Sequence, residues 1–370
     1  MAGKTIKTGV GKLFDQAIEL IRTARNQAAR QTNSLMVFTY FHLGRLIIEH
    51  EQGGKVKADY GKETIKELSK KLTEHFGDGF SERNLEQMRL FYSLYRSKMH
   101  IPSISQTPSA KSLTAKKSQT SSAKSPALYT PAQHSRKSLA EIFPLSWSQY
   151  VLLCRIKDSS ERQFYEIETI QNNWSVRELQ RQFESDLYVR LALSKNKKQV
   201  KQLAQKGQVI EKPEDVLKSP YVLEFLGLES KPAYSESDLE SAIINKIEHF
   251  LLEMGKGFLF GGRQVRFSFD GEDFFVDLVL YNRLLQCFVL VDLKIGKLKH
   301  QDIGQMQMYV NYYDRYVRKE YEKPTIGIVI CKDKSDAVVE ITLPKGNKTI
   351  FAKEYKLYLP TKGELKKVLG

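Results

Sequence analysis

The sequence predicts an α+β protein, in which an all-helical N-terminal region is followed by an α-β-β-β-α-β domain with a mixed sheet. Two observations predict this fold. Apolar side chains recur three and four residues apart through residues 12–97 and again through residues 138–228, which is the spacing of one helix face. Short runs rich in Val, Leu, Ile and Phe, bounded by turn residues, gather instead in the C-terminal part, where they indicate buried strands.

The composition divides the chain into four parts. We predict a helical N-terminal domain over residues 1–97, a helical middle region over residues 138–232 and the α/β part over residues 233–370. Residues 98–137 are rich in Ser, Lys, Thr, Pro and Ala, and no acidic residue occurs from Gln87 through Ala140. This composition indicates a disordered basic linker, which is either a tether or a source of further phosphate contacts.

The N-terminal domain is predicted to hold two helices within residues 12–52, a third that ends at a glycine, and a last one with Ser81 as its N-cap. The turn Gly77–Gly79 would join the last two as in a helix-turn-helix, with Arg89 and Arg96 as nucleic-acid contacts on the outer face. Two acidic residues on the same face argue against DNA recognition. A plain helical bundle therefore stays open as the alternative.

Net charge and cysteine usage narrow the classes of function. The formal charge of +15 favours a polyanionic partner, DNA or alternatively RNA, because neutralisation of phosphates dominates such affinity. No apolar run is long enough to span a bilayer, and the N-terminus lacks the apolar core of a signal peptide. The three cysteines are scattered without metal-ligand spacing and suit a reduced compartment. We therefore expect a cytoplasmic protein without membrane contact.

Charged residues interrupt two of the apolar runs in the C-terminal part. Asp277 lies in one predicted strand, and Asp292 and Lys294 lie in the next, on the same face because side chains alternate along a strand. A buried carboxylate is costly unless it is paired or binds a metal. A structural ion pair is the plain alternative. Two carboxylates beside a lysine also fit a hydrolytic site, where the acids hold Mg²⁺ or Mn²⁺ and the lysine positions the attacking water.

The elements around these residues have a definite predicted order. A helix is predicted over residues 235–257, followed by two strands that turn at Asp270-Gly271, as in a β-hairpin. After the third strand come a helix over residues 300–317 and a buried strand over residues 325–333. The tail from Val338 is predicted to add strands to the sheet and to end in a short helix.

In this order of elements, the acids and the lysine resemble the motif of the PD-(D/E)xK nuclease superfamily, which has a restriction-endonuclease-like fold. Asp277 matches the first acid of that motif, and Asp292 and Lys294 match its D/E-x-K part. The sequence departs from the motif at Val276, which stands where the motif has its proline.

The same resemblance adds two residues on helices. Gln305, in GQMQMYV, matches the glutamine on the helix after the third strand. The superfamily often has a glutamate on its first helix, and Glu240 is the candidate because it heads the apolar stripe of residues 235–257. Glu253 is the alternative, although it falls on another face of a regular helix. The resemblance implies that Asp277, Asp292 and Glu240 hold the metal and that Gln305 orients the lysine or the phosphate.

Longer segments are similar to a bacterial family, the YhcG family, whose C-terminal part is a predicted nuclease. These segments are YFHLGRLIIEHEQ, FGDGFSERNLEQMRLFY, EHFLLEMGKGFLFGGRQ and VDLKIGKLKHQDIGQMQMY. The resemblance implies nuclease activity but no particular substrate. Together with the acids, the lysine and the positive charge, it leads us to expect a Mg²⁺- or Mn²⁺-dependent endonuclease that acts on DNA in repair, recombination or defence, with RNA as a substrate and a homodimer or larger homo-oligomer left open. Lys297 and Lys299, just after the motif, would contact the nucleic acid. The alternative is a non-catalytic nucleic-acid-binding or interaction protein with a nuclease-like fold.

Overall fold

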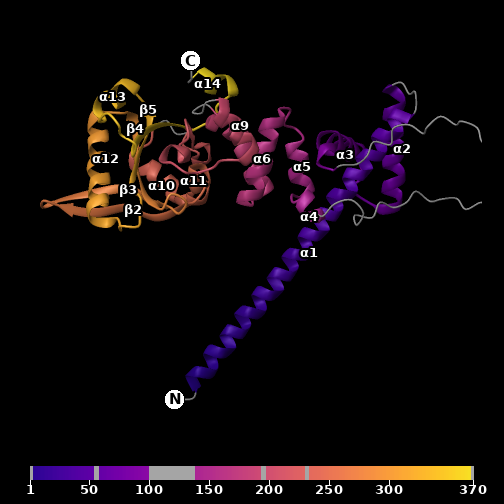
Figure 1. Cartoon of the computed structure of the whole chain (residues 1–370), viewed down its shortest axis with the longest axis horizontal. Helices are drawn as coiled ribbons and strands as arrows, with labels where there is room; N and C mark the ends of the chain where they lie inside the picture. The colour runs from indigo at the N-terminus through magenta and orange to yellow at the C-terminus, as the bar shows by residue number, and fades with distance from the viewer. Residues whose placement is uncertain (1–2, 54–57, 100–137, 193–196, 230–232, 368–370) are drawn as a thin grey trace, which may run out of the picture. The chain divides into compact units, whose positions relative to one another are not determined.

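A computed structural model describes residues 3–53, 58–99, 138–192, 197–229 and 233–367 (Figure 1). The chain forms two compact units, residues 1–157 and residues 158–370. The predicted fold class is confirmed: an N-terminal helical region precedes a C-terminal unit with a mixed six-stranded sheet. The predicted linker lies outside the described residues except for Lys98 and Met99, and the predicted domain limits stay a prediction.

The N-terminal unit is built from helices alone in its described part. The long helix α1 is one continuous element, so the prediction of two helices within residues 12–52 is wrong. The polar residues 31–33 continue the helix with exposed side chains, and no proline interrupts it. The elements are α1 (Gly3–Gly53), α2 (Ala58–Phe76), α3 (Glu82–Tyr95), the 3-10 helix η1 (Arg96–Lys98), α4 (Leu139–Ile142) and α5 (Trp147–Leu153).

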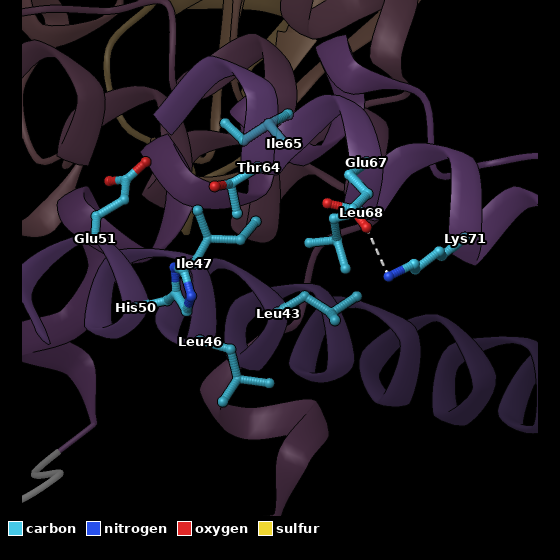
Figure 2. A pocket seen from close by; sticks show the side chains of 10 residues that line it. All are labelled: Leu43, Leu46, Ile47, His50, Glu51, Thr64, Ile65, Glu67, Leu68 and Lys71. Carbon is cyan, nitrogen blue, oxygen red and sulfur yellow. Dashed lines mark ion pairs between the residues drawn. The ribbon is translucent and has the colours of Figure 1, made fainter. Parts of the chain in front are cut away.

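Helix α3 packs closely against α1. Its N-cap is Ser81, as predicted, whose side chain accepts a hydrogen bond from the backbone N–H of Asn84. Between α1 and α2 lies a groove of about 340 Å³, and Figure 2 shows the side chains that line it. The aliphatic side chains that line it are Leu43, Leu46, Ile47, Ile65 and Leu68. It holds none of the residues predicted to be catalytic.

The second unit begins with helices that precede the sheet. Ser175 caps α7 by accepting a hydrogen bond from the backbone N–H of Glu178. The helix predicted over residues 235–257 is broken at Lys246, which leaves helical geometry with φ −125° and ψ 32°. The elements are α6 (Ser159–Asn172), α7 (Val176–Glu184), α8 (Leu187–Ala192), α9 (Lys197–Lys206), the 3-10 helices η3 (Pro213–Val216) and η4 (Glu224–Leu226), α10 (Glu236–Asn245) and α11 (Ile247–Met254).

The six strands lie in the order β1-β6-β5-β4-β3-β2. Strand β3 pairs antiparallel with both β2 and β4, whereas the pairs β4–β5, β5–β6 and β6–β1 are parallel. Helix α12 (His300–Tyr312), extended by the π-turn η5 (Tyr313–Val317), connects β4 to β5. The strands are β1 (Tyr221–Val222), β2 (Phe258–Phe269), β3 (Glu272–Asn282), β4 (Cys287–Lys297), β5 (Ile326–Asp333) and β6 (Ile350–Lys356).

Helices cover both faces of this sheet (Figure 1). On one face, Ile243 of α10 and Phe250 of α11 share a core with the strands; on the other, Met306 of α12 does so. Residues 336–342 form the helix α13 (Asp336–Thr342) rather than the predicted strand, and α14 (Lys362–Lys367) ends the described chain. No helix in the described part of the chain is long and apolar enough to cross a membrane.

Candidate active site

The site lies where β3 and β4 separate. Their pairing runs from Asn282↔Cys287 to Leu278↔Val291 and continues no further. Beyond that point the side chain of Asp277 takes the place of the backbone hydrogen bonds between the strands. Its Oδ2 accepts a hydrogen bond of 2.8 Å from the backbone N–H of Leu293. The carboxylate of β3 is thereby fixed against β4, one residue from Asp292.

Strand β2 is irregular at the same level. Its pairs Arg263↔Leu278 and Val265↔Val276 flank Gln264 and Asp277, and Gln264 has a left-handed backbone with φ 47°. A side chain with that backbone is rare inside a strand and marks a local constraint. The irregularity places the amide of Gln264 beside the carboxylate of Asp277.

A single amide joins two of the acids. Nε2 of Gln264 donates to Oε2 of Glu240 at 2.8 Å and to Oδ1 of Asp277 at 2.9 Å. Glu240 comes from α10, and its side chain is largely buried beside the sheet. The structure therefore brings a helical glutamate to the first acid of the motif.

Asp292 and Lys294 form an ion pair on β4. Oδ2 of Asp292 is 2.9 Å from Nζ of Lys294, and the residue Asp292 is only 2% exposed. Among the described residues this oxygen has no hydrogen-bond donor beyond that contact. The lysine also lies 3.9 Å from Oε2 of Glu236 at the start of α10.

The electrostatics of the cluster favour a bound cation. Burial, followed by the charge of Asp277, raises the pKa of Asp292 to about 7. Burial raises the pKa of Glu240 as well, with the charge of Asp277 adding to the effect. Burial alone would lower the pKa of Lys294, but Asp292 outweighs it and raises that pKa to about 12. The carboxylates thus repel one another while the lysine stays charged at neutral pH.

The donor set suits a hard divalent cation. Three carboxylates, from Asp277, Asp292 and Glu240, are the oxygen ligands that Mg²⁺ and Mn²⁺ prefer. In the described parts of the chain no three acidic, His or Cys side chains already form a metal-binding group. Two of the three acids are instead held by the amide of Gln264, and the third by Lys294. The three carboxylates are therefore suitable ligands for Mg²⁺ or Mn²⁺.

Comparison with known proteins shows the family of the chain. A family model described as the YhcG PDDEXK nuclease domain matches residues 214–370, and one described as the DUF1016 N-terminal domain matches residues 16–190. "Putative nuclease YhcG" of Escherichia coli (strain K12) is 40% identical over 366 residues, which cover 96% of this chain and 92% of that protein. The chain belongs to the YhcG family. The resemblance predicted from the sequence is confirmed, and the family and its fold are those of a nuclease.

Solved structures match a smaller part of this YhcG-family chain. A repair endonuclease from Pyrococcus abyssi shares 21% identity and covers 35% of this chain, with a TM-score of 0.24. The structure of an EndoMS–dsDNA complex shares 18% identity and covers 36%, with a TM-score of 0.25. The overlap spans about half of each solved chain. Similarity of this extent carries no information about activity.

The remaining predicted residues of this YhcG protein lie in different surroundings. The amide of Gln305 donates to the hydroxyl of Tyr309, which in turn donates to the backbone carbonyl of Phe275 at 2.9 Å. Gln305 is thus held on α12 by a tyrosine, and its predicted role toward the lysine stays a prediction. Lys297 and Lys299 are both exposed, the first at the end of β4 and the second as N-cap residue of α12.

The alternative helical acid, Glu253, lies in a separate network. Its carboxylate is fully buried, 2.5 Å from Nη1 of Arg190, and it also contacts Arg181. Glu240 is therefore the helical acid at the cluster.

The arginines predicted in the N-terminal unit differ in their surroundings. Arg89 forms an ion pair of 2.8 Å with Glu51 of α1, and Arg96 is exposed in η1. Their role as nucleic-acid contacts stays a prediction.

Three residues of the site were not predicted: Gln264, Tyr309 and Glu236. A signal for Gln264 was present in the sequence. Pairing outward from the Asp270-Gly271 turn, starting with Phe269↔Glu272, places Gln264 opposite Asp277. Tyr309 follows Gln305 by four residues, which is one helical turn.

Proposed function

We propose that this YhcG-family chain is a divalent-metal-dependent endonuclease that hydrolyses phosphodiester bonds in DNA. The observation that carries the proposal is the convergence of three acids and a charged lysine where β3 and β4 separate. Glu240 comes from α10, Asp277 from β3, and Asp292 and Lys294 from β4. Asp277, Asp292 and Glu240 would hold Mg²⁺ or Mn²⁺, which when bound polarises the phosphate and lowers the pKa of a water molecule.

The chain's own residues set the geometry around the reacting phosphate. The hydrogen bond from the Leu293 N–H holds Oδ2 of Asp277 and thereby fixes the orientation of this carboxylate. Lys294, with a pKa of about 12, cannot accept a proton at neutral pH. Its role is therefore electrostatic: it orients the attacking water and stabilises negative charge that develops on the phosphate. Gln305, held by Tyr309, would orient the lysine or a phosphate oxygen.

Basic side chains in both units would hold the polyanion. Lys297 and Lys299 follow the lysine of the motif and are exposed, and Arg89 and Arg96 add basic groups in the other unit. The formal charge of +15 supports a nucleic-acid partner. Repair, recombination and defence against foreign DNA, in the cytoplasm, all suit such an activity. A homodimer or larger homo-oligomer would let one site per chain cut both strands.

Cleavage assays test the proposal directly. Supercoiled plasmid, linear duplex, branched DNA and RNA are incubated with the protein and Mg²⁺ or Mn²⁺, or with EDTA. Asp292→Ala and Lys294→Ala variants run beside the wild type, after their folding is confirmed by circular dichroism. We expect metal-dependent cleavage of DNA that both variants lose. DNA binding without cleavage, unchanged by either substitution, would instead show a recognition protein.

A further inference from the structure

A second feature adjoins the acidic cluster: a groove of about 610 Å³ at the carboxyl ends of the parallel strands. It is lined by the last residues of β4, β5 and β6, and by Tyr234 shortly before α10. Ligands of open α/β sheets bind at the carboxyl ends of the strands. The groove begins two residues beyond Lys294, at Gly296, and its residue Tyr234 lies two residues before Glu236, which approaches Lys294.

The groove combines aromatic rings with lysines. Nζ of Lys332 lies 6.0 Å from the ring centroid of Tyr234, and the hydroxyl of Tyr234 is 2.9 Å from that of Tyr355. Tyr358 also lines the groove and is 38% exposed. In the described part of the chain, Lys332 and Lys297 have no carboxylate within ion-pair distance, so both ammonium groups are available to an anion. Sites for unpaired strands combine such groups, because aromatic rings stack on the bases and lysines bind the phosphates.

Acidic side chains in the groove argue against a duplex backbone as its occupant. Glu229, Asp333 and Glu354 also line it, and Glu354 is 3.3 Å from Nζ of Lys356. A surface that binds only phosphates gains nothing from carboxylates. Carboxylates do accept hydrogen bonds from the amino groups of bases. In a continuous duplex those bases are stacked and paired, so their faces are not offered to a tyrosine.

We propose that this groove binds one or two unpaired nucleotides of the DNA strand next to the cleaved phosphodiester bond. Tyr234 would stack on a base, Lys332 and Lys297 would hold the adjoining phosphates, and the carboxylates would meet the edge of the base. The volume is in the range of small-ligand sites. The inference rests on the proposed nuclease function and narrows its substrate to DNA with an unpaired segment, such as a tail or a flap.

Binding to two tailed duplexes tests the groove without any cleavage. Both are fluorescently labelled and identical except that one single-stranded tail carries bases and the other is abasic, so the phosphates are equal in number. Affinities are measured by fluorescence anisotropy in EDTA. Stacking of a base is worth about 1–3 kcal/mol, so we expect the wild type to bind the tail with bases about tenfold more tightly.

Matched variants assign the effect to the groove. Tyr234→Ala should bring the ratio of the two affinities close to one, whereas Tyr234→Phe, which keeps the ring, should preserve it. Lys332→Ala should weaken binding of both tails several-fold and leave their ratio unchanged. Lys345→Ala, an exposed lysine in the loop between α13 and β6, should change neither. Thermal melting confirms that each variant is folded.

Equal affinity of the wild type for the two tails, or an unchanged ratio in Tyr234→Ala, would overturn the proposal. The outcome is independent of the nuclease assay. A preserved base-dependent ratio without metal-dependent cleavage would uphold the groove and refute the nuclease. Cleavage of DNA without that ratio would uphold the nuclease and refute the groove.

Discussion

Gln264 is the residue at which backbone strain and the acidic cluster meet. Its left-handed φ of 47° costs about 1 kcal/mol or more for a residue with a Cβ, and the amide that it positions binds two carboxylates. Strain of this kind persists only where the surroundings fix the conformation. The two hydrogen bonds to Glu240 and Asp277 supply such a constraint.

The backbone strain predicts an order of stability between two truncations. Gln264→Gly and Gln264→Ala both lose the amide, but only glycine adopts positive φ without steric cost. We expect the glycine variant to be more stable than the alanine variant by about 1 kcal/mol. Urea unfolding followed by circular dichroism measures the difference. An alanine variant as stable as the glycine variant would show that the backbone is not strained.

At this scale the sequence predicted part of the site. The two-residue spacing of Asp292 and Lys294 predicted that they share a face, and they lie 2.9 Å apart. The bridging amide was missed because Gln264 matched no motif, and the strand irregularity that aims it has no signal in composition. The separation of β3 from β4 at Asp277 depends on a side chain replacing a backbone partner, which spacing alone does not reveal.

Elements of the second unit are joined by a buried charge network around Glu253. Burial raises the pKa of this carboxyl, but the charges of Arg190 and Lys218 outweigh burial and lower the pKa to about 2. Lys218 also donates to the backbone carbonyl of Glu253. The network thus ties α11 to α8 and to the segment before β1.

This network predicts loss of stability in acid. A carboxyl whose pKa falls from 4.5 to about 2 on folding contributes stability that is fully present above pH 4.5 and is lost as pH falls toward 2. The shift corresponds to about 3 kcal/mol. We expect Glu253→Gln to be less stable than the wild type at pH 6, because the substitution leaves Arg190 buried without its counter-charge. The stability of this variant should also depend much less on pH between pH 5 and pH 3.

Tryptophan fluorescence isolates the unit concerned. The chain has two tryptophans, and in a Trp147→Phe background Trp174 reports on the second unit alone. Urea unfolding of that protein is measured at pH 6, 4 and 3, with Glu320→Gln, an exposed acid, as the control. The account of the network fails if Glu253→Gln retains the full acid dependence.

Packing of α1 against α3 depends on a glycine. A Cβ on Gly44 would lie 2.6 Å from the carbonyl carbon of Met88, which is closer than packed atoms allow. We expect Gly44→Ala to destabilise the N-terminal unit by about 1–3 kcal/mol. Gly304, inside α12, has no neighbour within 4 Å of such a Cβ, so Gly304→Ala should instead stabilise by up to about 1 kcal/mol. Thermal melts of the two variants check the opposite signs.

Helices and strands were predicted well where local caps or turns determine them, and less well where tertiary packing determines the secondary structure. Ser81 caps a helix as predicted. Residues 338–342 look like a strand because Val and Ile are β-branched, yet they form α13, whose Val338 and Val339 pack beside α12. Packing of this helix against the core overrides local propensity.

At the scale of the whole chain, the sequence predicted the fold class and the family. It did not predict the groove beside the cluster, because that groove draws residues from four segments between Leu228 and Tyr358. No local pattern links those segments. Within the second unit, the sheet brings them to the end at which the acids also lie, so substrate selection and catalysis would occur side by side.

The most direct test of the central claim is the single-turnover rate of plasmid nicking with Mn²⁺ in wild type and in Asp292→Asn. The substitution keeps the shape of the side chain and removes the charge that would hold the metal, so we expect a rate loss of at least about 100-fold. The control is Glu322→Gln, a buried acid outside the cluster, which should stay within about threefold of wild type. If Asp292→Asn nicks the plasmid at the wild-type rate, the acidic cluster is not the catalytic site.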